Sequence, residues 1–243
     1  MAIKRIHVNR QDEESLKELQ KEVEFLKELK HPNIVAYYGS EIREDFLMIY
    51  LEYIDMGSIA YMLKNYGPFP EDIVINYTKQ ILLGLEYLHS HGVIHRDIKG
   101  ANILVSTEGI AKLSDFGSAK KLHNSCLSSY IGTTSWMAPE IILDKQYERF
   151  ADIWSLGCTV FEMLTGKPPF MGKTHYEASL KVINFNDETF QYPPHITSLA
   201  RDFLKCCLRK SPYKRLNVKK LLEHPFIQKA ELNFDQNEGD QAS

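Results

Sequence analysis

The sequence lacks the features that would point to several other classes of protein. Its apolar runs are far shorter than a membrane-spanning helix needs, and its N-terminus has no signal-peptide pattern. Acidic residues slightly outnumber basic ones, giving a formal net charge of -3 and no general basic surface for nucleic acid. We therefore predict a protein with neither membrane insertion nor nucleic-acid binding.

Cysteine is also scarce. The four cysteines show no paired spacing typical of a disulfide framework or a zinc site; they are Cys126, Cys158, Cys206 and Cys207. With no targeting segment, this pattern fits a reducing compartment and predicts a cytoplasmic location. Apolar residues are plentiful, at 44% of 243 residues, which is enough for a substantial core in one large domain or two lobes.

One stretch, residues 93–117, places polar side chains between short apolar segments. These segments indicate three strands, at residues 93–94, 103–105 and 112–114. A turn at Thr107-Glu108-Gly109 predicts that the last two strands form a hairpin centred near Glu108.

The predicted hairpin brings two oxygen-bearing side chains together. Reflecting the chain about Glu108 places Asn102 opposite Ser114, so Asp115 returns to within reach of Asn102. A carboxylate and an amide oxygen facing one point suit Mg²⁺, with phosphates and water in the other positions. Single Asp and Asn residues in loops are more often turn formers, so the prediction depends on their combination.

Asp97 precedes Asn102 by five residues and shares its loop with Lys99. This places a potential general base beside a cation that could hold a transferring phosphoryl group.

Three ordered motifs resemble those of protein kinases. They are His95-Arg96-Asp97 with Lys99 and Asn102, then Asp115-Phe116-Gly117, then Ala138-Pro139-Glu140. The sequences of residues 98–102 and 136–140 are similar to those of serine/threonine kinases of the sterile-20 and MAP kinase kinase kinase groups. The MAP kinase kinase kinase group is the closer of the two.

The resemblance implies an α+β, bilobal protein-kinase-like fold over residues 1–227. A small N-terminal lobe would hold a reduced sheet and one helix, and a larger C-terminal lobe would be mainly helical. The implied parts are an N-lobe at 1–51, a hinge at 52–57, a C-lobe at 58–227 and an acidic, polar, disordered tail at 228–243.

The implied reaction is transfer of the γ-phosphate of ATP to a protein Ser or Thr, with Mg²⁺ as cofactor. Asp97 would orient the hydroxyl and accept its proton, and Lys99 would steady the γ-phosphate. Asn102 and Asp115 would hold the metal ion. The closer group would make the substrate a MAP kinase kinase.

The N-terminal residues Ala-Ile-Lys resemble the kinase strand whose lysine contacts the α- and β-phosphates, which makes Lys4 the candidate. The family pairs this lysine with a helix glutamate. Glu22 flanks a predicted apolar stripe that includes Val23 and Leu26, so it is the candidate partner of Lys4. Glu18 is then an ordinary surface charge.

The resemblance also implies an adenine site. The backbone of Glu52 and Ile54 would hydrogen-bond adenine, and Leu51 would guard the back of the pocket. Leu104 would form the floor, a role that an ordinary core leucine can also fill.

Residues 118–135 are rich in hydroxyl groups and occupy the place of an activation segment. Ser129, four residues before Thr133, is the first choice of phosphosite, and Ser128 is the second. Thr133 would bridge Asp97 and Lys99, as in the serine/threonine class. A phosphate on the segment could pair with Arg96.

Two structural contacts are also expected from the resemblance. Asp152, at the start of a nearly all-apolar helix, would bind the backbone of the turn formed by His95 and Arg96. Arg215 would be the buried partner of Glu140.

The sequence contains no G-x-G-x-x-G hairpin, which in the family precedes the lysine strand and covers the phosphates. Weaker ATP binding and lower stability are the expected consequences. Two interpretations therefore stand. The chain is either a working kinase, whole or truncated, or it lacks catalysis, as a pseudokinase-like interaction module or a truncated product. The joint presence of Lys4, Asp97, Asn102 and Asp115 favours the enzyme.

Overall fold

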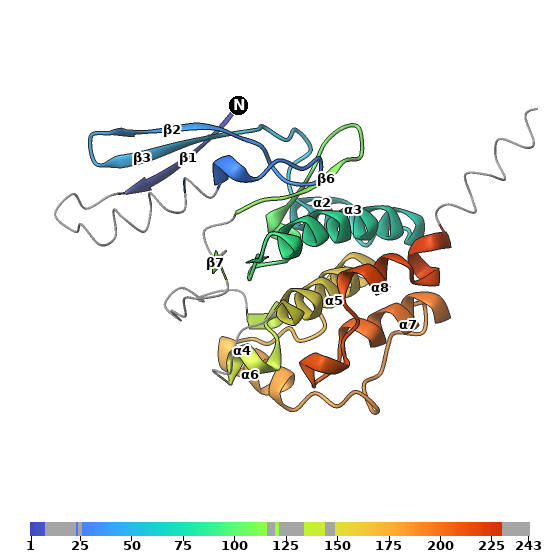
Figure 1. The fold of residues 1–243 in the computed structure, drawn as a ribbon. Helices are drawn as coiled ribbons and strands as arrows, with labels where there is room; N and C mark the ends of the chain where they lie inside the picture. The colour runs from blue at the N-terminus through green and yellow to red at the C-terminus, as the bar shows by residue number, and fades with distance from the viewer. Residues whose placement is uncertain (8–22, 24–25, 116–119, 122–133, 144–148, 230–243) are drawn as a thin grey trace, which may run out of the picture.

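The fold has two lobes, as expected from the sequence (Figure 1). The computed structural model describes residues 1–7, 23, 26–115, 120–121, 134–143 and 149–229. A small sheet forms one end of the molecule, and helices form the larger lobe. No helix within these described ranges is both long and apolar enough to cross a membrane.

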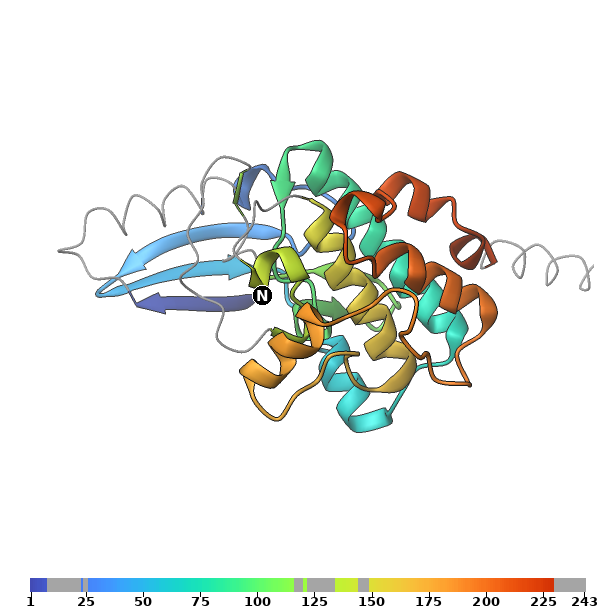
Figure 2. The same cartoon turned by 90° about the horizontal axis from the view of Figure 1, so that it is seen from below.

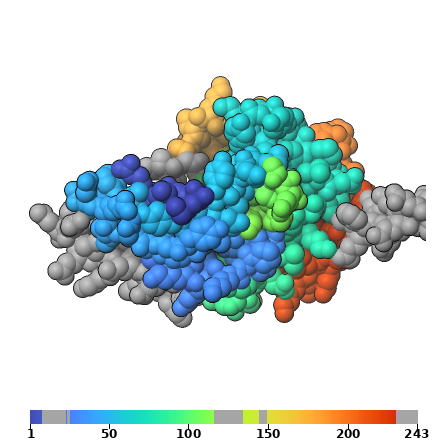
Figure 3. All heavy atoms as spheres, turned by 90° about the horizontal axis from the view of Figure 1, so that it is seen from above, coloured from blue at the N-terminus to red at the C-terminus, as the bar shows by residue number. Residues whose placement is uncertain are grey.

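The N-terminal lobe is built on a three-stranded antiparallel sheet in the order β1-β3-β2. Its strands are β1 (Ala2–His7), β2 (Tyr37–Arg43) and β3 (Phe46–Leu51). Val23 and Leu26, from the predicted apolar stripe, are buried and belong to the core. In the view of Figure 3, β1 and the light-blue β2 and β3 lie at one end of the molecule.

The predicted boundaries of β2 were wrong. From the sequence alone, apolar residues at 34–38 predict a strand and polar residues at 41–45 predict a turn. In the structure the strand begins at Tyr37 and continues to Arg43, and only Glu44 and Asp45 separate it from β3. The polar residues fit an edge strand because their side chains interact along it. Glu41 accepts a hydrogen bond from Tyr50 and pairs with Arg43 at 2.7 Å.

The C-terminal lobe begins with two helices whose bounds follow their capping residues. The Ser58 side chain accepts a hydrogen bond from the amide of Tyr61 at the start of α2 (Ile59–Tyr66), and Gly67, with φ of 81°, ends this helix. Gly92, with φ of 70°, follows the end of α3 (Glu71–Ser90).

Short elements after α3 contain or flank the residues predicted to act in catalysis and metal binding. They are β4 (Val93–Ile94), η1 (Gly100–Asn102), β5 (Ile103–Val105), β6 (Ala111–Leu113) and β7 (Lys120–Lys121). β5 pairs with β6, and β4 pairs with β7. In Figure 3 the green turn of the β5–β6 hairpin reaches the surface beside the light-blue strands.

The remaining helices complete the larger lobe (Figure 2). They are η3 (Thr134–Trp136), α4 (Pro139–Ile142), α5 (Phe150–Thr165), α6 (His175–Ile183), α7 (Ser198–Cys207), η4 (Pro212–Lys214) and α8 (Val218–Leu222). Of these, η3, α7 and η4 pack against α5. Every residue of α5 from Ala151 to Leu164 is buried, because the helix is apolar on nearly all sides. This helix is the centre of the larger lobe.

The predicted tail begins within the folded part of the chain. Gln228 donates a side-chain hydrogen bond to the Leu222 carbonyl at 2.9 Å, and Lys229 pairs with Glu71 at 3.0 Å. Residues 230–243 lie outside the described residues.

Candidate active site between the lobes

Most residues predicted to bind ATP line one cavity of about 290 Å³ between the lobes. Its walls come from β1, β3, β5 and the residues that follow β6. The lining residues are Ala2, Lys4, Leu26, Val35, Ile49, Leu51, Glu52, Leu104, Ser114 and Asp115. Ile54 is buried but does not line this cavity. A mainly apolar cavity with a few polar groups suits a flat ring carrying an anionic tail.

Two predicted site residues meet at the polar end of this cavity. The Lys4 ammonium lies 2.7 Å from Asp115 Oδ1, although the two residues are 111 positions apart. Asp115 has a φ of 59°, which is unusual for a residue with a side chain. The left-handed backbone turns the chain directly after β6, where the carboxylate meets β1.

The hairpin geometry predicted from the sequence is confirmed. Ile103 pairs with Leu113, so the hairpin is centred at Glu108. The Ser114 amide and hydroxyl both donate to the Asn102 carbonyl at 2.9 Å. Ser114 therefore lies opposite Asn102, and Asp115 follows one residue later. β6 ends at Leu113 and not at Ser114, because these bonds to Asn102 lie beyond the strand ladder.

Asp97 is held by the two polar side chains with which it shares its loop. Its Oδ2 accepts hydrogen bonds from Lys99 Nζ at 2.8 Å and from Asn102 Nδ2 at 2.7 Å. Its Oδ1 is buried and has no hydrogen-bond partner within the described part of the chain. An unpaired buried carboxylate oxygen is costly, so this atom suits a proton donor brought by a substrate.

The donor set also fits a magnesium ion. Asn102 uses its amide nitrogen for Asp97, which leaves its amide oxygen as a possible ligand. No cluster of three or more His, Cys, Asp or Glu side chains gathers as a metal site in the described ranges. Mg²⁺ needs no such cluster, because it takes one or two protein oxygens together with phosphates and water.

Asp152 shapes the loop that carries Asp97, as the resemblance implied. The Asp152 carboxylate accepts hydrogen bonds from the backbone amides of His95 at 3.0 Å and Arg96 at 2.9 Å. His89 Nε2 lies 2.8 Å from it. Burial alone would raise the pKa of Asp152, but these hydrogen bonds and His89 hold the pKa below its ordinary range.

His95 is buried and neutral in this arrangement. Its Nδ1 accepts a hydrogen bond from the Asp97 amide at 3.3 Å, and its Nε2 lies 3.1 Å from the Ser114 carbonyl. Burial lowers the pKa of His95, against the opposing effect of nearby carboxylates such as Asp152. One neutral imidazole therefore joins the loop of Asp97 to Ser114, the residue before Asp115.

Sequence reasoning missed a second carboxylate on α5. Glu162 is buried, and its Oε2 accepts hydrogen bonds from the Gly100 amide at 3.2 Å and from Trp136 Nε1 at 3.0 Å. Burial raises the pKa of Glu162, although both hydrogen bonds oppose the shift. The available signal was an acidic residue in an otherwise apolar helix, where a buried charge needs partners.

Arg215 and Glu140 form the predicted buried pair. Two guanidinium nitrogens donate to the two Glu140 oxygens at 2.6 and 2.8 Å. Arg215 also donates to the carbonyl groups of Arg209 and Phe150. The pair therefore joins α4 to the segments around η4 and the start of α5.

Four predicted site residues lie outside the described residues: Glu22, Ser128, Ser129 and Thr133. Their roles stay predictions.

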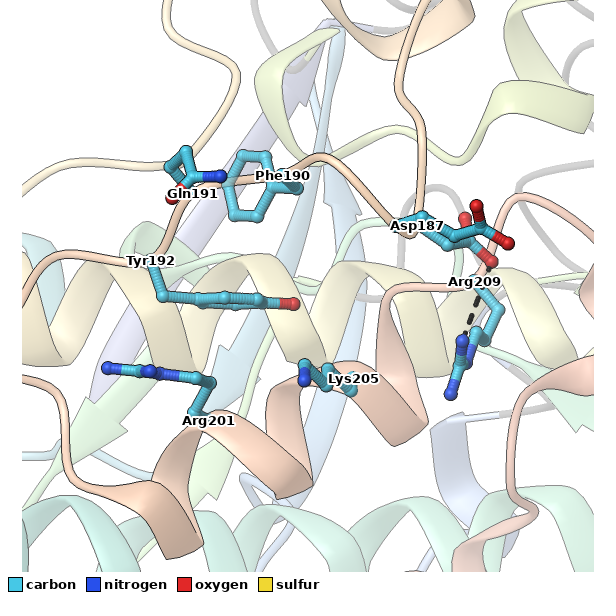
Figure 4. Close-up of a pocket in the computed structure, with 8 residues that line it drawn as sticks. Asp187, Phe190, Gln191, Tyr192, Arg201, Lys205 and Arg209 are labelled. Carbon is cyan, nitrogen blue, oxygen red and sulfur yellow. Dashed lines mark ion pairs between the residues drawn. The ribbon is translucent and has the colours of Figure 1, made fainter.

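A second cavity, of about 360 Å³, lies away from the predicted site residues, between α7 and the loop at 187–192 (Figure 4). The Tyr192 ring lies above Arg201, and Asp187 faces Arg209, with 3.8 Å between their charged groups. Burial raises the pKa of Tyr192. The lining mixes both signs of charge and contains none of the residues predicted to act in catalysis or metal binding.

The protein kinase domain family matches residues 1–227 of the chain. The chain belongs to the protein kinase family. This kinase domain is 47% identical over 231 residues to mitogen-activated protein kinase kinase kinase 3 of Arabidopsis thaliana, an alignment covering 93% of the chain and 38% of that relative.

Other curated relatives carry similar names. Mitogen-activated protein kinase kinase kinase ANP1 of Arabidopsis thaliana is 47% identical, with 87% of the chain and 32% of the relative covered. Mitogen-activated protein kinase kinase kinase 19 of Homo sapiens is 42% identical, with 90% and 17% covered. The kinase domain thus spans about two fifths or less of the length of these relatives.

Proposed function

We propose that the chain is a serine/threonine protein kinase that acts at the MAP kinase kinase kinase level of a signalling cascade. It transfers the γ-phosphate of ATP to a Ser or Thr of a protein substrate. The names of the relatives support the level in the cascade, and on that basis a MAP kinase kinase is the substrate class. The cysteine pattern of the sequence supports the cytoplasm as the location.

The arrangement around Asp97 carries this proposal. One oxygen is fixed by Lys99 and Asn102, while the other is buried and unpaired within the described residues. A carboxylate held in one orientation can align a hydroxyl group and accept its proton as the bond to phosphorus forms. Lys99, at 2.8 Å, is placed to offset negative charge on the transferring group.

Lys4, Asn102 and Asp115 serve the nucleotide in this proposal. Lys4 binds the α- and β-phosphates, and Asn102 and Asp115 hold Mg²⁺. When bound, the ion neutralises charge on the phosphates. The cavity wall from Leu51 to Leu104 takes the adenine ring, whose edge faces the backbone between Glu52 and Ile54.

The test is Mg²⁺-dependent transfer from labelled ATP to the chain itself and to a MAP kinase kinase. The Asp97→Asn variant should lose about 10²–10⁴ in rate while it keeps its fold. Asp72→Asn, at an exposed acid in the first turn of α3, is the matched control and should keep its rate. Transfer by Asp97→Asn within a few-fold of the unsubstituted chain would contradict the role of Asp97.

The same assay separates the enzyme from an interaction module. If the unsubstituted chain neither transfers phosphate nor binds Mg²⁺-ATP, the kinase proposal fails.

A further inference from the structure

The Glu52 side chain is anchored on two sides. Both carboxylate oxygens accept hydrogen bonds from Lys112 Nζ, at 2.8 and 2.9 Å. Oε2 also accepts from the Ala36 amide at 3.1 Å, while the Glu52 amide donates to the Ala36 carbonyl at 2.9 Å. The two charged side chains are only 14% and 23% exposed, for Lys112 and Glu52 respectively, so water screens the pair weakly.

Lys112 reaches Glu52 from the hairpin that carries the metal ligands. In the β5–β6 ladder Lys112 stands directly opposite Leu104. Directly opposite residues of antiparallel strands project to the same face, so Lys112 shares the face of Leu104, which lines the nucleotide cavity. The neighbours Ile103 and Leu113 are fully buried on the other face.

The pair therefore joins two walls of the cavity. One wall is the chain at Glu52, where the segment facing the adenine edge begins, and the other is Leu104, the predicted floor. In a cavity of about 290 Å³, a small shift of either wall would change both the stacking and the hydrogen bonding of a bound adenine ring. Asp115, three residues after Lys112, lies at the other end of the same cavity.

We propose that Lys112 is a positioning residue for nucleotide binding. Its ion pair holds the Glu52 backbone at a fixed spacing and orientation relative to Leu104, so that the adenine ring fits between them. This inference rests on the proposed function as an ATP-dependent kinase. It places the effect of Lys112 at the adenine end of the cavity, whereas the effect of Lys4 is at the phosphate end.

Loss of the ammonium group has a specific expected effect. In Lys112→Met the Glu52 carboxylate keeps only the Ala36 amide as a partner, so it turns toward water and moves the adjoining backbone. A hydrogen bond between charged groups contributes about 1.5–3 kcal/mol, which corresponds to a loss of roughly 10- to 150-fold in nucleotide affinity if all of it is expressed in binding. Because part of the loss is recovered by water, about five- to tenfold is expected.

The experiment measures the dissociation constants of ATP and of adenosine for the whole chain by calorimetry, together with KM and kcat. Lys112→Met should lower the affinity for ATP and for adenosine by the same factor. It should leave kcat within about twofold of the unsubstituted value, since the catalytic loop is unchanged. Lys112→Arg should restore most of the affinity, because guanidinium can also pair with both Glu52 oxygens. Lys219→Met, at an exposed lysine of α8, is the control and should bind both ligands normally.

A merely structural role would give a different pattern. Unchanged dissociation constants in Lys112→Met, or weakened ATP with unchanged adenosine, would overturn the inference. Should Lys112→Met fail to fold, Glu52→Gln, which keeps the shape of the side chain and removes its charge, must show the same equal loss for both ligands. If the unsubstituted chain binds neither ligand, the proposed function fails together with this inference; normal binding with an unaffected variant overturns the role of Lys112 alone.

Discussion

The Lys4 ammonium contacts Asp115 at 2.7 Å, so a strand of the small lobe meets a predicted metal ligand of the large lobe at the cavity between the lobes. The Lys4 side chain is 37% exposed and that of Asp115 is 50% exposed. An ion pair this exposed to solvent contributes only about 0–1 kcal/mol to stability. The position of Lys4 is therefore better explained by a ligand than by the stability of the fold.

Replacing Lys4 should separate ligand binding from stability. Lys4→Met should weaken ATP binding by about 10- to 100-fold, the value of one or two charge-assisted hydrogen bonds, and leave adenosine affinity unchanged. The melting temperature should shift little. Titration calorimetry and thermal unfolding measure both, with Lys64→Met at an exposed position of α2 as the control. Equal loss of ATP and adenosine affinity would contradict a role at the phosphates.

The pair of Arg215 and Glu140 should behave in the opposite way. The Arg215 side chain is fully buried and that of Glu140 is 8% exposed, so removing one partner leaves an uncompensated buried charge. Arg215→Met should lower the free energy of unfolding by about 3–5 kcal/mol. Denaturant unfolding measures this change.

A double-mutant cycle checks that the two charges act together. The double variant Arg215→Met with Glu140→Gln should lose less stability than the two single losses added. Additive losses would show that each side chain acts through separate contacts, such as the bonds of Arg215 to Phe150 and Arg209.

Burial of His95 predicts a pH dependence of stability. Burial lowers the pKa of His95 in the folded chain from the ordinary value of 6.5. Between the two pKa values, the imidazole is therefore protonated in the unfolded chain and neutral in the folded chain. Stability should therefore fall as pH drops below 6.5 and level off below the folded pKa, with a slope of at most about 1.4 kcal/mol per pH unit.

The comparison of the unsubstituted chain with His95→Gln isolates this effect, because the two proteins share every other histidine. Chemical denaturation between about pH 5 and pH 7.5 should show the smaller slope in His95→Gln. Identical slopes would indicate that His95 gains its proton without loss of the native contacts.

Gly157, inside α5, should tolerate no side chain. An added Cβ would lie 2.7 Å from the Cys207 Cβ and 3.0 Å from Leu208 Cδ2, in a fully buried contact. Gly157→Ala should therefore destabilise the chain by about 1–3 kcal/mol, despite the better helix propensity of alanine. At Gly39 the nearest atom is 3.9 Å away, so Gly39→Ala in β2 is the control for denaturant unfolding. Equal effects of both substitutions would show that α5 and α7 can separate at little cost.

Local patterns predicted much of the site. Reflection about Glu108 placed Asn102 opposite Ser114, because hairpin register follows from the turn and the short strands. The same reflection places Lys112 opposite Leu104, yet the partner of Lys112 could not be inferred, since Glu52 is 60 residues away and nothing local indicates the pairing. The contact depends on how the lobes pack.

Other contacts came only through the resemblance or were missed. The partners of Asp152 and Arg215 were expected because of the family, whereas a lone carboxylate such as Glu162 does not reveal whether its donor is Gly100 or another group. The boundaries of β2 were misjudged because charged residues on an exposed edge strand resemble those of a turn. In each case tertiary surroundings determined what the local sequence left open.

Helix α5 holds the loop of Asp97 at two points. Asp152, near its first turn, binds the amides of His95 and Arg96, and Glu162, ten residues later and about 15 Å along the axis, binds the amide of Gly100. The loop of Asp97, the proposed base, is thus bonded to the buried helix at the centre of the larger lobe. If the small lobe tilts, Lys4 travels with it, whereas Glu52, paired with Lys112, and Asp97 stay with the large lobe. Movement of the lobes would then change the phosphate end of the cavity without disturbing the alignment of the proposed base.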